Sequence, residues 1–196
     1  MAAHDQATTR SGAGPSDAAL VVEARAGAAW ACEALFRRHA PAINGLVYRL
    51  IGRDVDLDDL VQETFVQAFT SLHRLHTPAS FASWLAAIAV RTTYKMLRRR
   101  RLLTRLGLRR SEPIDPDALV SRDAPLEVAA DLRRVYGVVD TLAPKLRVAL
   151  LLRRVEGASL EEIAELTGAS LATVKRRIAE AERILASALG IERRTT

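Results

Sequence analysis

The sequence predicts an all-α protein with two small helical domains joined by a flexible acidic linker, the second domain ending in a helix-turn-helix. Across its 196 residues the apolar side chains recur at helical spacing, and the alternation of β-branched and aromatic residues that is typical of strands is absent. A proline-bearing, mostly acidic stretch interrupts this pattern once. The expected parts are a disordered N-terminal tail at 1–16, domains at 17–110 and 127–190, the linker at 111–126, and a C-terminal tail at 191–196.

The first domain opens with two helical segments. Residues 1–16 are small and polar, too poor in apolar groups to offset the entropy lost on ordering, so we expect a flexible tail. From Asp17 onward apolar residues such as Leu20 and Leu35 follow helical spacing. Pro41 suits the first turn of a further helix that carries Ile43 to Leu50.

A third helical segment runs from Asp56 to Phe69. Its apolar positions, beginning at Leu60, recur on one side, and its first-turn carboxylates suit the positive end of the helix dipole. Polar residues gather on the opposite side, which we expect to be exposed: Gln62, Glu63 and Gln67, together with Val66.

A long helix is expected from about Phe81 toward Leu97, after the break at residues 77–80. Its far end is strongly basic, and the aromatic residues Trp84 and Tyr94 lie in or near the basic stripe. Cations together with aromatic rings suit phosphate contact and base stacking. Two plainer interpretations stay open, namely a solvated charge run and a core position for Trp84.

The second domain begins after the acidic linker and ends in the helix-turn-helix between Ser159 and Ile178. Ser159 can cap the first helix with Glu162 as its capping-box partner, and Gly168 supplies the left-handed residue that ends it. Ser170 can cap the second helix, which carries Lys175, Arg176 and Arg177 early, where cations can reach a DNA groove and its phosphates. The alternative is a helical hairpin within a bundle.

Bulk properties narrow the function classes further. The net charge of +6 favours a polyanionic partner, and nucleic acid in particular. Cys32 is the only cysteine, and we expect a cytoplasmic protein without membrane insertion. No cofactor or metal is expected, because the only candidate ligands near the segment at 75–80 are His73 and His76. No catalytic site is expected, because no nucleophile has a paired base.

Taken in order, these motifs resemble the extracytoplasmic-function (ECF, group IV) sigma factors of the sigma-70 family. Residues 56–65 resemble region 2.2 of that family, 81–89 resemble region 2.3 running into region 2.4, and 142–157 with the helix-turn-helix resemble region 4. The order of the motifs is more specific than any one of them, since a lone helix-turn-helix occurs in many unrelated regulators.

The resemblance implies a promoter-specificity subunit that binds core RNA polymerase and helps to melt DNA, with no catalysis of its own. The β′ clamp helices and the β flap would be its docking partners, and a separate anti-sigma factor would inhibit it. The implied polymerase-binding residues are Asp58, Asp59, Gln62, Glu63 and Gln67. The implied −10 residues are Phe81, Trp84, Arg91, Tyr94, Lys95, Arg98 and Arg99, beside a loop around 75–80 that holds a flipped base. The implied −35 residues are Ser170, Thr173, Lys175, Arg176, Arg177, Ala179 and Glu180.

This chain departs from the family pattern at several of these positions. Family members often carry an aromatic residue or His and then Arg where this chain has Ala179 and Glu180, and another Arg at Glu182. Because a carboxylate can accept from a cytosine amine, an unusual −35 sequence is the resulting hypothesis. Arg91 and Lys95 also depart from the region 2.4 pattern. The alternative function is a helix-turn-helix regulator that acts without core polymerase.

Overall fold

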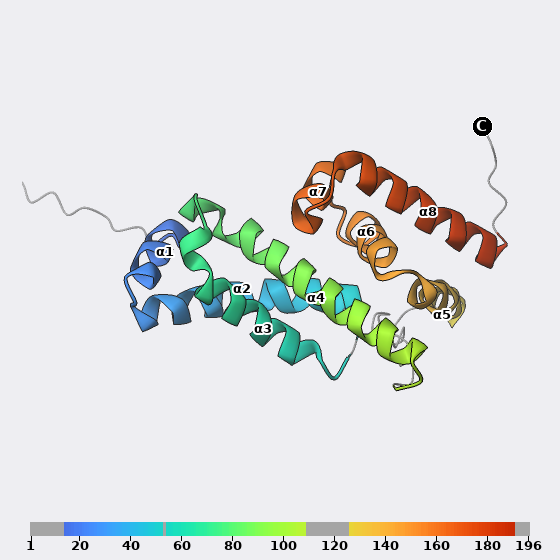
Figure 1. Ribbon diagram of the computed structural model, residues 1–196, viewed down its shortest axis with the longest axis horizontal. Coiled ribbons are helices and arrows are strands. Elements are labelled where there is room, and N and C mark those ends of the chain that lie inside the picture. Colours follow the sequence, from blue (N-terminus) through green and yellow to red (C-terminus); the bar gives the residue numbers. More distant parts are fainter. Residues whose placement is uncertain (1–13, 53, 109–125, 191–196) are drawn as a thin grey trace, which may run out of the picture.

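The computed structural model describes residues 14–52, 54–108 and 126–190, and within these ranges the regular structure is helical throughout. The expected linker at 111–126 lies outside the described residues except for its last position, as do most of the N-terminal tail and all of the C-terminal tail. The helices form two groups, α1 to α4 and α5 to α8, which lie against each other (Figure 1). The all-α prediction is confirmed.

The first group is built on two long helices. Helices α1 (Asp17–Arg25) and α2 (Ala29–Ile51) are followed by α3 (Leu57–Thr70) and the short turns η1 (Leu72–Arg74) and η2 (Pro78–Ser80). Helix α4 (Phe81–Arg105) then runs back along α2 and α3 (Figure 1). Completely buried residues such as Leu35, Val47 and Leu85 join these helices into one core.

Helix α2 corrects one sequence prediction. Pro41 lies inside the helix and does not begin it. A proline inside a helix removes a backbone hydrogen bond and costs about 3 kcal/mol. Buried side chains on both sides of it, Leu35 before and Ile43 and Val47 after, keep the helix continuous because breaking it would expose them.

The second group comprises α5 (Leu126–Thr141), α6 (Pro144–Arg154), α7 (Leu160–Thr167) and α8 (Leu171–Leu189). Helix α6 is the central one, and Leu146, Val148 and Leu152 are almost completely buried. Helices α7 and α8 pack across it and across each other as the expected helix-turn-helix. Helix α6 also contacts α2 and α4, and α7 contacts α4, so the two groups share an interface.

Candidate nucleic-acid and polymerase interfaces

Each cap predicted for the helix-turn-helix is present. The Ser159 hydroxyl accepts a hydrogen bond from the Glu162 backbone N–H at 3.1 Å, and the Glu162 carboxylate accepts from the Ser159 N–H at 2.7 Å. Gly168 ends α7 in the left-handed region at φ 64°, which favours glycine. The Ser170 hydroxyl then accepts from the Thr173 N–H at 3.3 Å and begins α8. The sharp change of chain direction at residues 168–170 thus follows from local chemistry.

The outer face of α8 is exposed to solvent. Val174, Ile178 and Ala181 point into the core, which turns Lys175, Arg176, Ala179 and Glu180 outward, where all four are exposed. Thr173 and Arg177 are half-buried at the edge of this face, and Ser170 is exposed at its start. The α8 face, as we call these seven residues, carries cations and hydroxyls along one helix.

Glu182 has a role inside the domain. Its carboxylate accepts from Nε of Arg154 on α6 at 3.0 Å, which ties α6 to α8. This ion pair compensates the Glu182 charge, so of the unusual carboxylates on α8 only Glu180 belongs to the exposed α8 face.

A separate polar surface lies on α3. Asp58, Asp59, Gln62 and Glu63 are exposed, and Gln67 is half-buried with its amide donating to Glu63 at 2.6 Å. Val66 lies among them with 53% of its surface exposed. We call these residues the α3 face. An acidic and amide face around one apolar residue suits a basic helical partner, and it would repel DNA phosphates.

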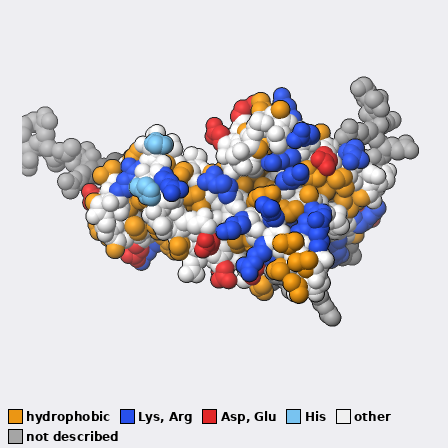
Figure 2. Space-filling view, in the orientation of Figure 1, with side chains coloured by type: hydrophobic (Ala, Val, Ile, Leu, Met, Phe, Trp, Pro, Cys, Tyr) orange, Lys and Arg blue, Asp and Glu red, His pale blue; other side chains and the backbone are white. Residues whose placement is uncertain are grey.

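Helix α4 carries the basic side chains predicted for DNA. Arg91, Lys95, Arg98 and Arg99 are exposed, and Trp84 and Tyr94 are half-buried. Lys and Arg side chains gather over α4 and the neighbouring α6 to α8 half in Figure 2. Phe81 is different because it is completely buried, with its ring 5.2 Å from that of His39 and 6.1 Å from that of Trp84. Its side chain supports Trp84 from within the core.

Arg100 interrupts the basic run. It forms ion pairs with Asp54 and Asp56 in the segment between α2 and α3, and its side chain is only 15% exposed. Burial opposes the charge of Arg100, but the hydrogen bonds that its guanidinium donates to Asp54 and Asp56 outweigh burial and raise the pKa of Arg100. Arg100 therefore anchors the start of α3 on α4, whereas Arg98 and Arg99 have no carboxylate partner among the described residues.

The segment between α3 and α4 is held from α1. Arg25 donates to the carbonyls of Leu72, at 3.2 Å, and Leu75. Both leucines are buried, while His76, Thr77 and Ser80 beyond them are exposed. The exposed part of this segment thus starts from a fixed point.

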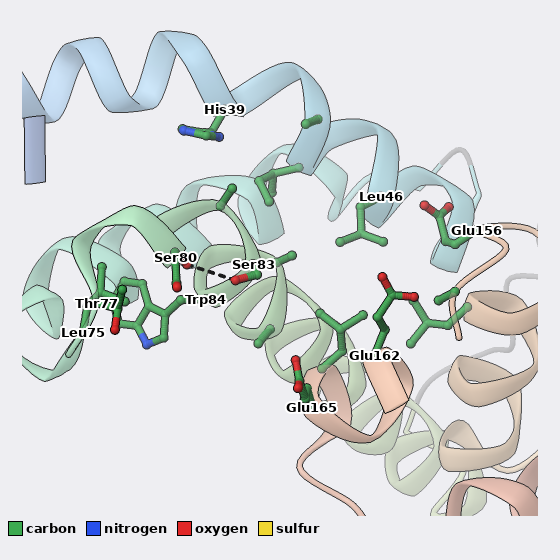
Figure 3. Close-up of a pocket in the computed structure, with 18 of the residues that line it drawn as sticks. His39, Leu46, Leu75, Thr77, Ser80, Ser83, Trp84, Glu156, Glu162 and Glu165 are labelled. Atoms are coloured by element: carbon green, nitrogen blue, oxygen red, sulfur yellow. Dashed lines mark hydrogen bonds between the residues drawn. The ribbon is translucent and has the colours of Figure 1, made fainter. Parts of the chain in front are cut away.

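A pocket of about 800 Å³ opens between this segment, α2 and α7 (Figure 3). In that view Leu75, Thr77, Ser80 and Trp84 lie on one side, and Glu156, Glu162 and Glu165 lie on the other. Leu46 and Leu166 contribute apolar walls. A second, smaller cavity of about 80 Å³ lies between Arg91 and Tyr94 of α4, Lys145 of α6 and Arg177 of α8.

Sequence reasoning missed the residues that join distant segments. Arg25, Arg49, Arg100 and Arg147 each bind a partner that lies at least 44 residues away along the chain, in addition to any local contact. Their neighbours in the sequence are also basic or apolar, so no local pattern distinguishes them.

No group of three or more His, Cys, Asp or Glu side chains that could hold a metal occurs within the described ranges. In the same ranges no helix is both long and apolar enough to span a membrane.

Two family models match the chain, one in each helical group. Residues 35–102 match sigma-70 region 2, and residues 132–185 match sigma-70 region 4. The first match therefore contains the α3 face and the basic part of α4, and the second contains the helix-turn-helix.

Curated relatives and solved structures agree with these matches. The chain is 36% identical over 148 residues to the ECF RNA polymerase sigma factor SigE of Mycolicibacterium smegmatis, covering 74% of this chain and 56% of that protein. It is 30% identical to the ECF RNA polymerase sigma-E factor of Haemophilus influenzae, covering 87% of this chain and 93% of the relative. CnrH, solved in complex with the cytosolic domain of CnrY, is 26% identical with a TM-score of 0.58, covering 91% of this chain and 99% of CnrH. RpoE of Bartonella quintana, solved with the anti-sigma factor NepR, is 23% identical with a TM-score of 0.60 over 82% of this chain and 98% of RpoE, which supports the fold alone.

Proposed function

The chain belongs to the ECF sigma factors of the sigma-70 family, and we propose that it binds core RNA polymerase in the cytoplasm and directs it to promoters through −10 and −35 contacts. It acts by binding and helps to melt DNA, with no chemical step of its own. The observation that carries the proposal is the separation of two chemically opposite surfaces, the acidic α3 face and the basic faces of α4 and α8, on one chain.

The α3 face is the surface for polymerase. Asp58, Asp59 and Glu63 offer carboxylates to a basic helical partner, and Gln62 and Gln67 offer amides beside them. Exposed Val66 gives this surface an apolar centre, and an apolar centre with a polar rim is the usual anatomy of a protein interface. The clamp helices of the β′ subunit are the partner that the family resemblance implies.

Helix α4 and the segment before it serve the −10 element. Arg91, Lys95, Arg98 and Arg99 contact the phosphates of the melted strand, while Trp84 and Tyr94 offer rings to its bases. The segment at 75–80 receives a flipped base, and Arg25 holds its starting point. Phe81 supports this surface from the core.

The α8 face serves the −35 element in the major groove. Lys175 and Arg176 suit guanine edges, and Thr173 and Arg177 lie nearer the backbone. Glu180 is exposed where it can accept from a cytosine amine, so a cytosine at one −35 position is expected. A separate anti-sigma factor is the proposed inhibitor, as the family resemblance implies, and CnrH, at 26% identity, was itself solved in complex with a second chain, the cytosolic domain of CnrY.

The experiment that tests the proposal is run-off transcription on fragmented genomic DNA with purified core polymerase, with and without the protein. New start sites that share paired upstream elements are expected. Asp59→Lys together with Glu63→Lys should abolish core binding and leave −35 duplex binding intact. A matched control is Glu33→Lys on α2, an exposed carboxylate outside the α3 face. DNA binding without new starts or core binding would favour the plain helix-turn-helix regulator.

A further inference from the structure

Three basic side chains from three helices converge on the small cavity between α4, α6, α7 and α8. Arg91 of α4, Lys145 of α6 and Arg177 of α8 line it, together with the hydroxyl-bearing residues Tyr94 and Thr167. The described residues that line the cavity include no aspartate and no glutamate. Its volume of about 80 Å³ gives room for a few water molecules or for one small polyatomic ion.

The core holds the backbone around this cavity in place. Val90 of α4 and Val148 of α6 also line it, and they are only 1% and 2% exposed. Arg91 directly follows Val90 in the chain, and Lys145 lies one helical turn before Val148. The two cations are therefore carried by backbone that cannot shift without disturbing buried side chains, so the site exists before any ligand arrives.

The three cations have no counter-charge. Within the part of the chain that the structure describes, Arg91, Lys145 and Arg177 form no ion pair, whereas Arg154 of α6 is paired with Glu182 of α8. Like charges around one cavity repel each other, and the repulsion is screened less where Arg177 is half-buried. An anion in the cavity would replace this repulsion with attraction.

The donors around the cavity suit a phosphate group. An arginine presents parallel N–H donors that match a phosphate in bidentate geometry, and a lysine ammonium adds a point charge. The Tyr94 hydroxyl forms no hydrogen bond with the residues that the structure describes, so it can donate to a ligand. The Thr167 hydroxyl cannot, because it already donates to the Ile163 carbonyl at 2.6 Å.

We propose that this cavity is an anion site that binds one phosphate group, either as the free ion or as part of a nucleotide. Arg91 and Arg177 bind its oxygens from α4 and α8, Lys145 adds charge from α6, and Tyr94 donates a further hydrogen bond. A phosphate carries about two negative charges near neutral pH, which the three cations can compensate. The site is a property of the free chain, and only its effect on DNA binding rests on the proposed function.

Isothermal titration calorimetry of the full chain with inorganic phosphate tests the site. At an ionic strength held constant with sodium chloride, we expect saturable binding of one phosphate per chain. Lys145→Gln should weaken it about tenfold, because one charge-assisted hydrogen bond is lost, and Lys145→Arg should restore most of the affinity. The matched control is Arg183→Gln, which removes a charge from an exposed position of α8 that does not line the cavity.

Adenosine monophosphate, titrated in the same way, distinguishes the two sources of the phosphate group. Phosphate binding without nucleotide binding assigns the cavity to the free ion, and nucleotide binding that is as tight or tighter assigns it to a nucleotide. Saturable binding of neither would overturn the proposal. Equal affinities in Lys145→Gln and Arg183→Gln would also overturn it, since phosphate would then be attracted only by the general positive charge.

An anion in this cavity should also compete with DNA, because Arg91 belongs to the −10 residues and Arg177 to the −35 residues. The measurement is binding of a labelled single strand carrying the −10 sequence from the run-off experiment, in phosphate and in chloride of equal ionic strength. At about four times its own dissociation constant, phosphate should raise the apparent dissociation constant of the strand about fivefold, and less than about twofold in Lys145→Gln. Calorimetric binding without this competition would overturn the effect on DNA and leave the anion site standing.

Discussion

Arg99 and Arg100 are adjacent in the sequence and differ in their surroundings, so replacing each should have opposite consequences. Arg99 is exposed on α4, whereas Arg100 is 15% exposed and paired with Asp54 and Asp56. We expect Arg99→Met to weaken DNA binding with little change in stability. Arg100→Met should lower the stability of the fold and leave the DNA contact almost unchanged.

The magnitudes follow from these environments. Removing one partner of a buried ion pair costs about 3–5 kcal/mol. The lower value applies here because the Asp56 side chain is 35% exposed to solvent. Arg100→Met should therefore cost about 3 kcal/mol. Loss of one phosphate contact on single-stranded DNA lowers the slope of log affinity against log salt by about 0.7, which is the change expected for Arg99→Met.

Two assays separate these effects. Urea unfolding followed by circular dichroism gives the stability of each variant, and fluorescence anisotropy with a single strand between 50 and 200 mM salt, a range over which such affinities change strongly, gives the slope. Arg98→Met serves as a second exposed position on the same turn. Equal slope changes for Arg99→Met and Arg100→Met at equal stability would refute the assignment of Arg100 to the fold.

The remaining predictions concern the helix-turn-helix. Ser170→Ala removes the cap of α8 and should cost about 1 kcal/mol in urea unfolding. Gly168→Ala places a Cβ at φ 64° and should cost about 1–2 kcal/mol, measured in the same way. The hydrogen bond from the Ser159 backbone N–H lowers the pKa of Glu162 below its ordinary value of 4.5, so its stabilising contribution is complete above that pH and is lost as the pH falls through the lowered pKa. Glu162→Gln should remove this part of the acid dependence. Glu180→Gln should relax the preference at one −35 position in binding-site selection.

Matched controls exist for the first two of these changes. Ser187→Ala on α8 alters an exposed serine that caps no helix, and it should be nearly neutral. Gly137→Ala lies within α5, where no atom would meet the added Cβ, so it should stabilise the protein by about 1 kcal/mol. A destabilising Gly137→Ala or a neutral Gly168→Ala would contradict the backbone argument.

Most of the fold could be predicted because it depends on local patterns. The buried side of α3, which includes Leu60, Thr64 and Phe65, is the side that helical spacing selected. The caps at Ser159 and Ser170 involve residues three positions apart, so the sequence shows both partners together. The continuity of α2 through Pro41 could not be predicted, because it results from core packing on both sides of the proline.

The candidate site residues also differ in whether local sequence pattern or tertiary packing decides their exposure. The exposure of Gln62, Glu63 and Val66 follows from helix periodicity and the structure confirms it, whereas Gln67, also expected to be exposed, is half-buried. The residues of the α8 face were implied by the family resemblance, and the contacts of both faces with polymerase and DNA stay predictions.

Phe81 is the exception, since the family resemblance placed it among the −10 residues and the packing of α4 against α2 buries it completely. Its spacing with Leu85, Ile88 and Thr92 is the helical spacing of a buried face, and all four side chains are buried.

The sequence by itself determined most of the helices, the caps of the helix-turn-helix and the family, because each of these depends on residues within a few turns of one another or on motifs that follow in order along the chain. Only the tertiary structure decided what individual arginines do. Arg98, Arg99 and Arg100 are three consecutive arginines, yet Arg100 pairs with Asp54 whereas Arg98 and Arg99 are exposed to solvent. Arg49 and Arg147 meet their partners 107 and 97 residues away. Charge and hydrogen bonding depend on distance in space, and folding alone brings such distant groups within reach.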